Sequence, residues 1–431
     1  MDMPTIANTS RKSKSFIPTK GLLAKVARKL VHKQLIHLHS GCLQIEEEGK
    51  IFSFGEAVAD ADLVARLIVH DASCYGDILT GGSIGAAESF ITGDWSSPDL
   101  TLLVRVMVRN MDILDQMESG LALLSKPLLK TFHYFNQNSA KGSRRNIAAH
   151  YDLGNELFES FLDPTMMYSS AIFPSASASL EQASLNKLEI ICQKLQLNAA
   201  DHVVEIGTGW GGFAIYAAKH YGCRVTTTTI SKQQFNLAKQ RIEEAGLEDK
   251  ITLLLEDYRD LKKDHEGEFD KLVSIEMIEA VGWKFYNTFF AHCSALLKPE
   301  GIALIQAITI TDQRYDQARK DVDFIQRYIF PGSCIPSVTA LLNASTVASD
   351  LNLVQAQDFA AHYARTLKTW QESFNQKSNH ISKLGYSDDF KRMWQFYLSY
   401  CEGGFSERSI GVNHLVFAKP LAKLTYPADA I

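Results

Sequence analysis

After residue 200, short apolar runs alternate with helical patterns. The runs are five to seven residues long and read HVVEI, RVTTTTI, ITLLLE, KLVSI and IALIQAI. Helices are expected directly after Gly212 and from Lys232, where apolar residues recur with helical spacing. This alternation predicts a mostly parallel sheet with helices on both faces. In such sheets, ligands bind beyond the carboxyl ends of the strands.

The N-terminal part has a different pattern. Within residues 21–40, apolar positions recur at helical spacing with lysines and arginines between them, which predicts a basic amphipathic helix. The next segment, GCLQIEEEGKIFSFG, has apolar ends around an acidic, glycine-containing centre and predicts a β-hairpin. The polar stretch NQNSAKGSRRN marks the expected domain boundary. We therefore divide the chain into a disordered tail (1–19), an N-terminal domain (20–140) and a C-terminal domain (141–431).

Composition indicates a folded protein with at least one large core. The 431 residues are 46% hydrophobic, and the longest nearly apolar run is about half the length of a membrane-spanning helix. Seven cysteines are scattered without a Cys-x-x-Cys pair, which argues against a disulfide framework or a metal site. The N-terminus lacks the apolar core and cleavage site of a secretory signal, so a cytoplasmic location is expected.

Charge is unevenly distributed along the chain. The first 40 residues contain eight Lys or Arg and one acid, a net charge of +7, whereas the remaining residues carry −12. The basic helix could dock on anionic lipid, each basic residue contributing about 1 kcal/mol near the surface. A packing helix with a solvated basic face explains the same pattern. The acidic remainder argues against nucleic-acid binding.

The stretch VVEIGTGWGG, residues 203–212, predicts a cofactor site. Gly207, Gly209 and Gly212 have the spacing G-x-G-x-x-G, and four glycines in six residues exceed what a tight turn needs. Such glycines let a ligand approach the backbone, and the following helix offers free N–H groups. Nicotinamide dinucleotide folds share this spacing but usually end the second strand with Asp or Glu. Here that place reads TTTTIS, which favours another adenosine cofactor.

Together with longer motifs, this loop resembles the cyclopropane-fatty-acid synthase family of S-adenosylmethionine-dependent methyltransferases. The resemblance spans residues from about 50 to 418 and includes HYDLGNELFESFLDP, MMYSSAIF, FIQRYIFPGSCIPS, HYARTLKTW and FKRMWQFYLSYCEGGF. It implies an α/β, Rossmann-like class I methyltransferase fold with a mostly parallel seven-stranded sheet, preceded by a smaller α+β lipid-facing domain. The implied enzyme is peripheral at the inner face of the membrane. A homodimer is kept as a hypothesis.

The resemblance also implies the residues that contact the cofactor. A Tyr-Ser pair is expected to close over it, and a glutamate with the glycine loop to hold its methionine part. A Thr and a Gln are expected to take the ribose, and an Asp-Tyr pair to lie beside the adenine. The matching positions are Tyr168, Ser169, Glu205, Gly207, Gly209, Gly211, Thr229, Gln234, Asp257 and Tyr258.

The implied reaction methylates the double bond of an unsaturated acyl chain in a phospholipid, and ring closure then requires a base. In the family this base is thought to be a bound bicarbonate, held by a Glu, a Tyr, a His and a segment carrying a Cys. Glu279 and Tyr363 match the Glu and the Tyr. The Cys position is Ser170 and the His position is Gln306. Cys401 matches another family cysteine, although a buried small hydrophobic residue is the simpler interpretation.

The two departures leave the product open. Ser and Gln can hydrogen-bond an anion, but neither titrates near neutral pH as His does. Without a well-placed base, ring closure would fail and the product would be a methyl-branched or methylene-bearing unsaturated chain. A non-catalytic lipid-binding protein and a methyltransferase for a soluble small molecule are further alternatives. The intact Glu279 and Tyr363 argue against the first, and the long lipid-type motifs against the second.

Overall fold

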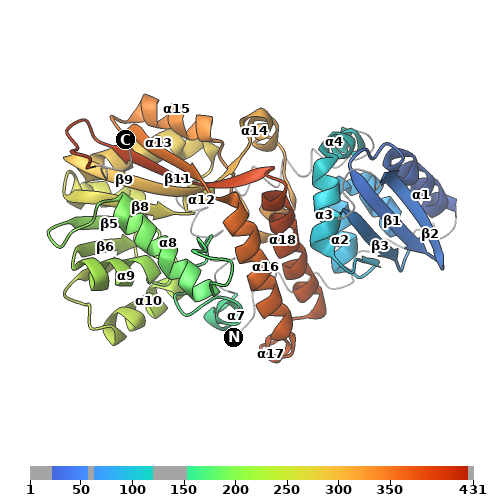
Figure 1. The fold of residues 1–431 in the computed structure, drawn as a ribbon, viewed down its shortest axis with the longest axis horizontal. Helices are drawn as coiled ribbons and strands as arrows, with labels where there is room; N and C mark the ends of the chain where they lie inside the picture. The colour runs from blue at the N-terminus through green and yellow to red at the C-terminus, as the bar shows by residue number, and fades with distance from the viewer. Residues whose placement is uncertain (1–21, 57–62, 120–152, 426–431) are drawn as a thin grey trace. The chain divides into compact units, whose positions relative to one another are not determined.

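The structure is a computed structural model that describes residues 22–56, 63–119 and 153–425 (Figure 1). The tail predicted over 1–19 and the boundary predicted at 136–146 lie outside these ranges, so the predicted domain bounds stay predictions.

The described residues form two compact units. The first unit combines the described residues before 120 with residues 320–329 and 367–409. The second unit contains residues 153–319, 330–366 and 410–425. None of the described helices is long and apolar enough to cross a bilayer.

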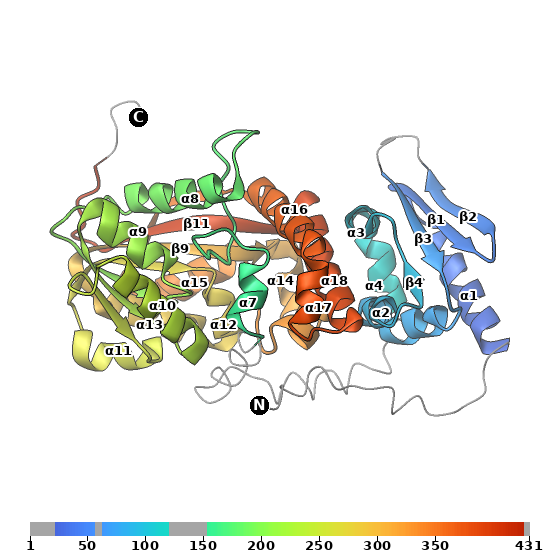
Figure 2. The ribbon, with the colours of Figure 1, turned by 90° about the horizontal axis from the view of Figure 1, so that it is seen from below.

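The second unit is built on a seven-stranded sheet with helices on both faces (Figures 1 and 2). From edge to edge its strands are β10 (Asn352–Asp358), β11 (Ile410–Ala418), β9 (Leu297–Ile310), β8 (Phe269–Ile275), β5 (His202–Ile206), β6 (Arg224–Thr228) and β7 (Ile251–Leu254). Strands β5 to β9 run parallel, and β11 is antiparallel to both β9 and β10. The predicted mostly parallel α/β sheet is confirmed.

Two hydrophobic clusters cover the two faces of this sheet. Val203 belongs to one cluster and Val204 to the other, because successive side chains of a strand point to opposite faces. The first cluster packs α8 (Leu180–Lys194), α9 (Gly212–Tyr221) and α10 (Lys232–Glu244). The second packs α11 (Tyr258–His265), α12 (Ile278–Val281), α13 (Tyr286–Leu296) and α15 (Val338–Ala348). The remaining short helices of this unit are α7 (Asn155–Glu159), η2 (Trp283–Phe285) and α14 (Asp312–Ala318).

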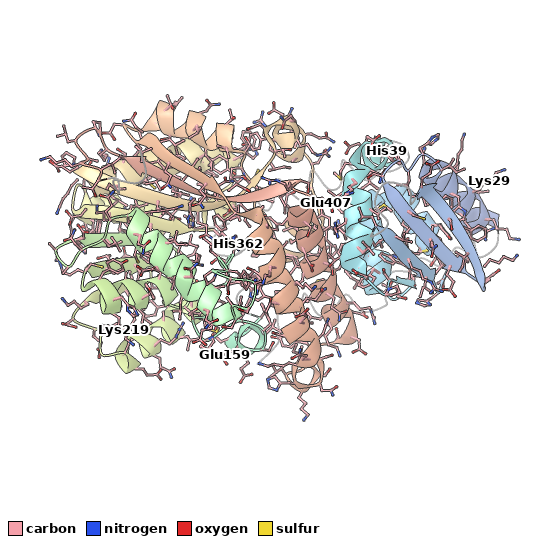
Figure 3. The ribbon with its side chains drawn as sticks, viewed as in Figure 1. Lys29, His39, Glu159, Lys219, His362 and Glu407 are labelled. Carbon is pink, nitrogen blue, oxygen red and sulfur yellow. The ribbon has the colours of Figure 1, made fainter. Side chains whose placement is uncertain are left out.

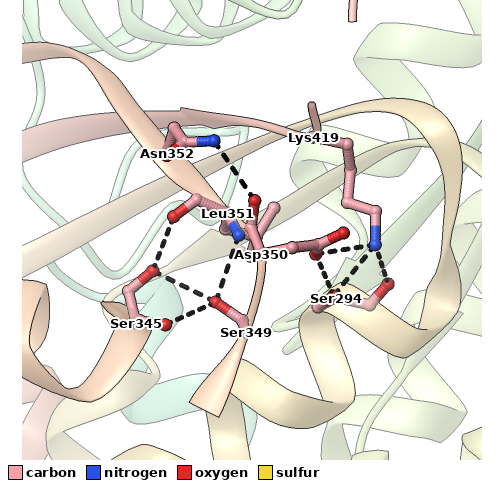
Figure 4. A network of polar contacts seen from close by, with 7 residues as sticks. All are labelled: Ser294, Ser345, Ser349, Asp350, Leu351, Asn352 and Lys419. Carbon is pink, nitrogen blue, oxygen red and sulfur yellow. Dashed lines mark hydrogen bonds and ion pairs between the residues drawn. The ribbon is translucent and has the colours of Figure 1, made fainter. Parts of the chain in front are cut away.

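A polar network holds the chain before the edge strand β10 (Figure 4). Lys419 Nζ donates to Asp350 Oδ1 at 2.8 Å and to Ser294 Oγ at 3.0 Å. Ser294 Oγ also donates to Asp350 Oδ1 at 2.6 Å, and Ser345 Oγ donates to the carbonyl of Leu351 at 3.1 Å. The network therefore links α13, α15 and the residue that follows β11.

The first unit contains a four-stranded sheet in the order β2-β1-β3-β4. Its strands are β1 (Gly41–Glu47), β2 (Lys50–Glu56), β3 (Val64–Val69) and β4 (Trp95–Ser96). Glu48 and Gly49 join β1 to β2 with φ of 49° and 73°, the two positive angles that a tight hairpin turn with the right twist requires. The predicted hairpin is confirmed.

The helices of this unit come from both ends of the chain. They are α1 (Leu22–Leu35), α2 (Cys74–Ile91), α3 (Leu100–Arg109), α4 (Met111–Ser119), η3 (Ile325–Ile329), α17 (Ser378–Lys383), α18 (Asp388–Ser406) and, from Leu367 on, α16 (Ala360–Gln376). A Cβ on Gly403 of α18 would lie 2.5 Å from Val104 Cγ1 of α3, so the two helices approach closely. Glu407 (Figure 3) accepts from Arg105 Nε and Arg109 Nε, each at 2.6 Å. These contacts explain why residues 367–409 group with the N-terminal part.

Candidate active site

The glycine loop connects the end of β5 to α9. Gly207, Gly209 and Gly211 have φ of 103°, 53° and 85°, in the region that favours glycine. A Cβ on Gly209 would meet no atom within 4 Å, whereas one on Gly212 would lie 2.5 Å from Met167 Sδ. Gly212 is thus explained by packing. Gly209 borders open space, and with the free N–H groups at the start of α9 this fits a ligand held against the backbone.

Buried polar side chains lie beside this loop. Glu205 Oε2 accepts from Thr227 Oγ1 at 2.6 Å, and burial raises the pKa of Glu205 to about 8. Lys187 of α8 is fully buried and donates from Nζ to Ser169 Oγ at 2.7 Å. Burial lowers the pKa of Lys187 to about 8, and the carboxylates of Glu276, Asp163 and Glu205 oppose this shift.

Lys187 was not among the residues predicted from the sequence. It is four residues from both Ala183 and Ile191, which are buried on the same helix. A lysine within the apolar stripe of an amphipathic helix is the pattern that could have indicated a buried cation.

The predicted ribose residues lie at the carboxyl end of β6. Thr229 Oγ1 donates to Gln234 Oε1 at 2.8 Å, and both side chains are buried. Beyond β7, Asp257 caps α11 and accepts from Arg259 Nε and Nη2 at 2.8 and 2.6 Å. Tyr258 packs in the hydrophobic cluster that contains α13, and its hydroxyl has no partner among the described residues. The cofactor-binding roles of these residues stay predictions.

Tyr168 of the predicted Tyr-Ser pair lies in an aromatic group. The ring of Tyr168 is 5.2 Å from that of Phe158, and Phe158 also contacts Trp210 at 4.9 Å between ring centroids. The indole N–H of Trp210 donates to Asn155 Oδ1 at 2.9 Å. This group places Tyr168 close to the glycine loop, which contains Trp210.

A second polar group gathers at the carboxyl end of β8, the neighbour of β5. Glu276 follows β8 directly, and its φ of 50° is unusual for a residue other than glycine. Its Oε1 accepts from the Ser170 backbone N–H at 2.9 Å and from Gln306 Nε2 at 2.7 Å. Its Oε2 accepts from the Tyr363 hydroxyl at 2.6 Å. Three predicted site residues therefore meet at a glutamate that the sequence analysis did not select.

A buried histidine extends this group. His414 of β11 is the strand partner of Gln306 on β9, and its Nε2 lies 3.0 Å from Gln306 Oε1. Because Gln306 Nε2 donates to Glu276, its Oε1 accepts, so His414 carries its proton on Nε2. His414 Nδ1 then accepts from Lys194 Nζ at 3.1 Å. Burial keeps the pKa of His414 well below its ordinary value, and the imidazole is neutral.

The predicted Glu279 is a neighbour of Glu276 with different contacts. It lies on α12, is 8% exposed, and its Oε1 accepts from the Ile308 N–H at 2.5 Å. Its Oε2 is buried and has no partner among the described residues. Burial and, second, the charge of Glu276 raise the pKa of Glu279 to about 8. Both effects favour the protonated form of this carboxyl.

Cys401 belongs to a different unit of the structure from the other predicted catalytic residues. It lies on α18 in the first unit, whereas Ser170, Glu279, Gln306 and Tyr363 belong to the second. Desolvation, and next the charge of Asp323, raise the pKa of its thiol, so a reactive thiolate is disfavoured there. The described residues contain no group of three or more His, Cys, Asp or Glu that could hold a metal ion.

Several known proteins are similar to this chain along most of its length. The chain matches the mycolic acid cyclopropane synthetase family over residues 138–415. It is 36% identical to the tuberculostearic acid methyltransferase UfaA1 of Mycobacterium tuberculosis over 90% of each chain. It is 38% identical to the cyclopropane-fatty-acyl-phospholipid synthase of Escherichia coli K12, over 82% of this chain and 88% of that one.

Solved structures show the same fold. The cyclopropane synthase MmaA2 from Mycobacterium tuberculosis superposes with a TM-score of 0.59 at 29% identity, covering 64% of this chain and 98% of the other. The mycolic acid cyclopropane synthase CmaA1, complexed with SAH and CTAB, gives a TM-score of 0.59 at 27% identity with the same coverage. S-adenosylmethionine is therefore the co-substrate, as the family resemblance implied. The chain belongs to the mycolic acid cyclopropane synthetase family of S-adenosylmethionine-dependent methyltransferases.

Proposed function

We propose that this methyltransferase acts on the double bond of an unsaturated fatty acyl chain in a phospholipid and closes a cyclopropane ring. The observation that supports this is the adjacency of two sites at the carboxyl ends of β5 and β8. One is the glycine loop, and the other is the polar group around Glu276. A Cβ on Gly207 would lie 3.3 Å from Met277 Cγ, so the residue after Glu276 packs against the loop. This adjacency supports the proposal, because a methyl donor held at the loop would lie beside a base in the polar group.

The chemistry that such an arrangement supports has two steps. S-adenosylmethionine supplies an electrophilic methyl group, and the double bond attacks it, which leaves positive charge on a chain carbon. A fixed carboxylate close to this charge stabilises it more strongly in a dry site than in water. A base then takes a proton from the new methyl group, and the C–H electron pair closes the ring.

A second candidate product is a methylated chain without a ring. It is favoured by the match to a tuberculostearic acid methyltransferase along 90% of both chains, and by Ser170 and Gln306 at the family's Cys and His positions. In this variant of the reaction the proton leaves a neighbouring chain carbon, and a double bond remains.

Mass spectrometry of fatty acids from cells that express the chain and receive methyl-deuterated methionine separates the two products. Ring closure removes one deuteron from each transferred methyl group, whereas loss of a chain proton keeps them all. Cells without any labelled fatty acid would contradict both proposals.

We also propose that α1 docks on anionic lipid. Lys25, Lys29 and Lys33 are exposed, and Figure 3 shows Lys29 on this helix. Between them, Val26 and Leu30 are 48% and 39% exposed, so apolar and basic side chains share one face. Such a face suits the boundary between headgroups and acyl chains. Arg28, by contrast, forms an ion pair with Glu47 at 2.9 Å.

A cytoplasmic location at the inner membrane face and a homodimer stay predictions.

A further inference from the structure

We infer that the Glu276 carboxylate is the base of the second step and occupies the anion site that bicarbonate was expected to fill. This inference rests on the proposed function, because it concerns the proton that leaves after methyl transfer. It differs from the sequence-based expectation, in which Glu279 helps to hold a bicarbonate that acts as the base.

The donors expected to bind bicarbonate are already satisfied by Glu276. The Ser170 N–H, the Gln306 amide and the Tyr363 hydroxyl donate to it over 2.6–2.9 Å. A second anion that accepted from the same three groups would overlap the carboxylate and be repelled by its charge. The Glu276 side chain thus supplies the anion that these donors are arranged to bind.

One oxygen of this carboxylate has a lone pair available to accept a proton. Each carboxylate oxygen has two lone pairs. Oε1 uses both on Ser170 and Gln306, whereas Oε2 accepts only from Tyr363 among the described residues. Glu276 as a residue is half-buried, while Ser170 and Gln306 are fully buried. Because Oε2 keeps a lone pair among these contacts, it is the atom that receives the proton.

The surrounding dipoles and charges stabilise the ionised form of Glu276. Lys194 donates to His414, His414 to Gln306 and Gln306 to Glu276, so every hydrogen bond in this chain points toward the carboxylate. Burial raises the pKa of Glu276 above its ordinary value, and the hydrogen bonds from Tyr363 and Ser170 and the Lys187 cation oppose this shift. Two adjacent buried carboxyls cannot both be charged without a large penalty. Both oxygens of Glu276 accept hydrogen bonds, whereas Glu279 Oε2 has no partner among the described residues, so Glu276 carries the charge and Glu279 the proton.

The proton transfer is balanced without a further reactant. A C–H bond of the new methyl group breaks, and its electron pair forms the third C–C bond of the ring. The proton binds Glu276 Oε2 and passes to water after the product leaves. For the second candidate product, the same carboxylate takes the proton from a chain carbon, and the electron pair forms a double bond.

The test uses the full chain with vesicles of dioleoylphosphatidylglycerol in buffer depleted of carbon dioxide. The release of S-adenosylhomocysteine is measured with and without added bicarbonate, and calorimetry measures the affinity for S-adenosylmethionine. Native turnover should not depend on bicarbonate. Glu276→Gln should lower turnover by at least about 100-fold, the scale of losing a general base, without changing that affinity. Glu276→Gly empties the anion site, and bicarbonate should restore part of its turnover.

Glu48→Gly is the matched control, because Glu48 is another glutamate with positive φ and lies in the hairpin of the first unit. Its turnover with and without bicarbonate, and its affinity for S-adenosylmethionine, should equal those of the native enzyme. Native turnover that requires bicarbonate, near-native turnover of Glu276→Gln, or a glycine variant that bicarbonate does not restore would each overturn the inference. Absence of native turnover on unsaturated vesicles in both buffers would instead contradict the proposed function.

Discussion

The hydrogen bond from Tyr363 to Glu276 offers a quantitative test of the site. The hydroxyl donates to Oε2 at 2.6 Å, and Tyr363 is 5% exposed. Tyr363→Phe removes this donor and leaves the ring in place. Because the donor stabilises the ionised carboxylate, its loss favours the protonated form and raises the pKa of Glu276 further above its ordinary value.

The size of the effect follows from the energy of one hydrogen bond. A bond to a charged group is worth about 1.5–3 kcal/mol, and one pKa unit corresponds to about 1.4 kcal/mol. The pKa of Glu276 should therefore rise by about 1–2 units in the variant. A base acts in its ionised form, so activity is lost as the pH falls through this pKa. The acidic limb of the pH profile should move to higher pH by about 1–2 units, and turnover below it should fall about 10–100-fold.

The assay is the release of S-adenosylhomocysteine at saturating lipid and methyl donor, measured across pH for the native enzyme and Tyr363→Phe. Tyr216→Phe is the control, because the Tyr216 hydroxyl also donates to a glutamate, Glu189, at 2.8 Å in the same unit. Its profile should equal that of the native enzyme. An acidic limb of Tyr363→Phe at the native position, or an equal loss of rate at every pH, would refute the reasoning.

Three further predictions concern the cofactor, the membrane and the core. Gly209→Val should abolish binding of S-adenosylmethionine in calorimetry while circular dichroism stays native, because its Cβ enters the open space beside the loop; undiminished affinity would contradict this. Replacing Lys25, Lys29 and Lys33 by Gln should weaken the free energy of binding to anionic vesicles by about 3 kcal/mol at low salt, as measured by sedimentation. Binding equal to that of the native protein would indicate that α1 is only a packing helix. Gly403→Ala should lower the free energy of unfolding in urea by about 1–3 kcal/mol, because α3 leaves no room for a methyl group; an unchanged midpoint would show that the helices can separate.

The local pattern of apolar and polar residues predicted many of the strands and helices of the second unit. HVVEI became β5 with the predicted bounds, and the helix from Lys232 begins there in the structure. Strands buried on both faces need continuous apolar runs, so their places in the sequence are visible without tertiary information. The glycine loop was equally predictable, since its function depends on neighbouring residues in one turn. The β1–β2 hairpin followed from a turn of two residues.

Only the tertiary structure decided which residues meet in the site. Ser170, Glu276, Gln306 and Tyr363 are far apart in sequence, and they meet because of the order in which strands lie in the sheet. His414 reaches Gln306 because β11 runs antiparallel beside β9, which no local pattern indicates. The sequence motif contains two glutamates three residues apart, and it does not distinguish them. The carboxylate that carries the charge is the one that the fold surrounds with donors, because a buried charge is stable only where other segments supply hydrogen bonds.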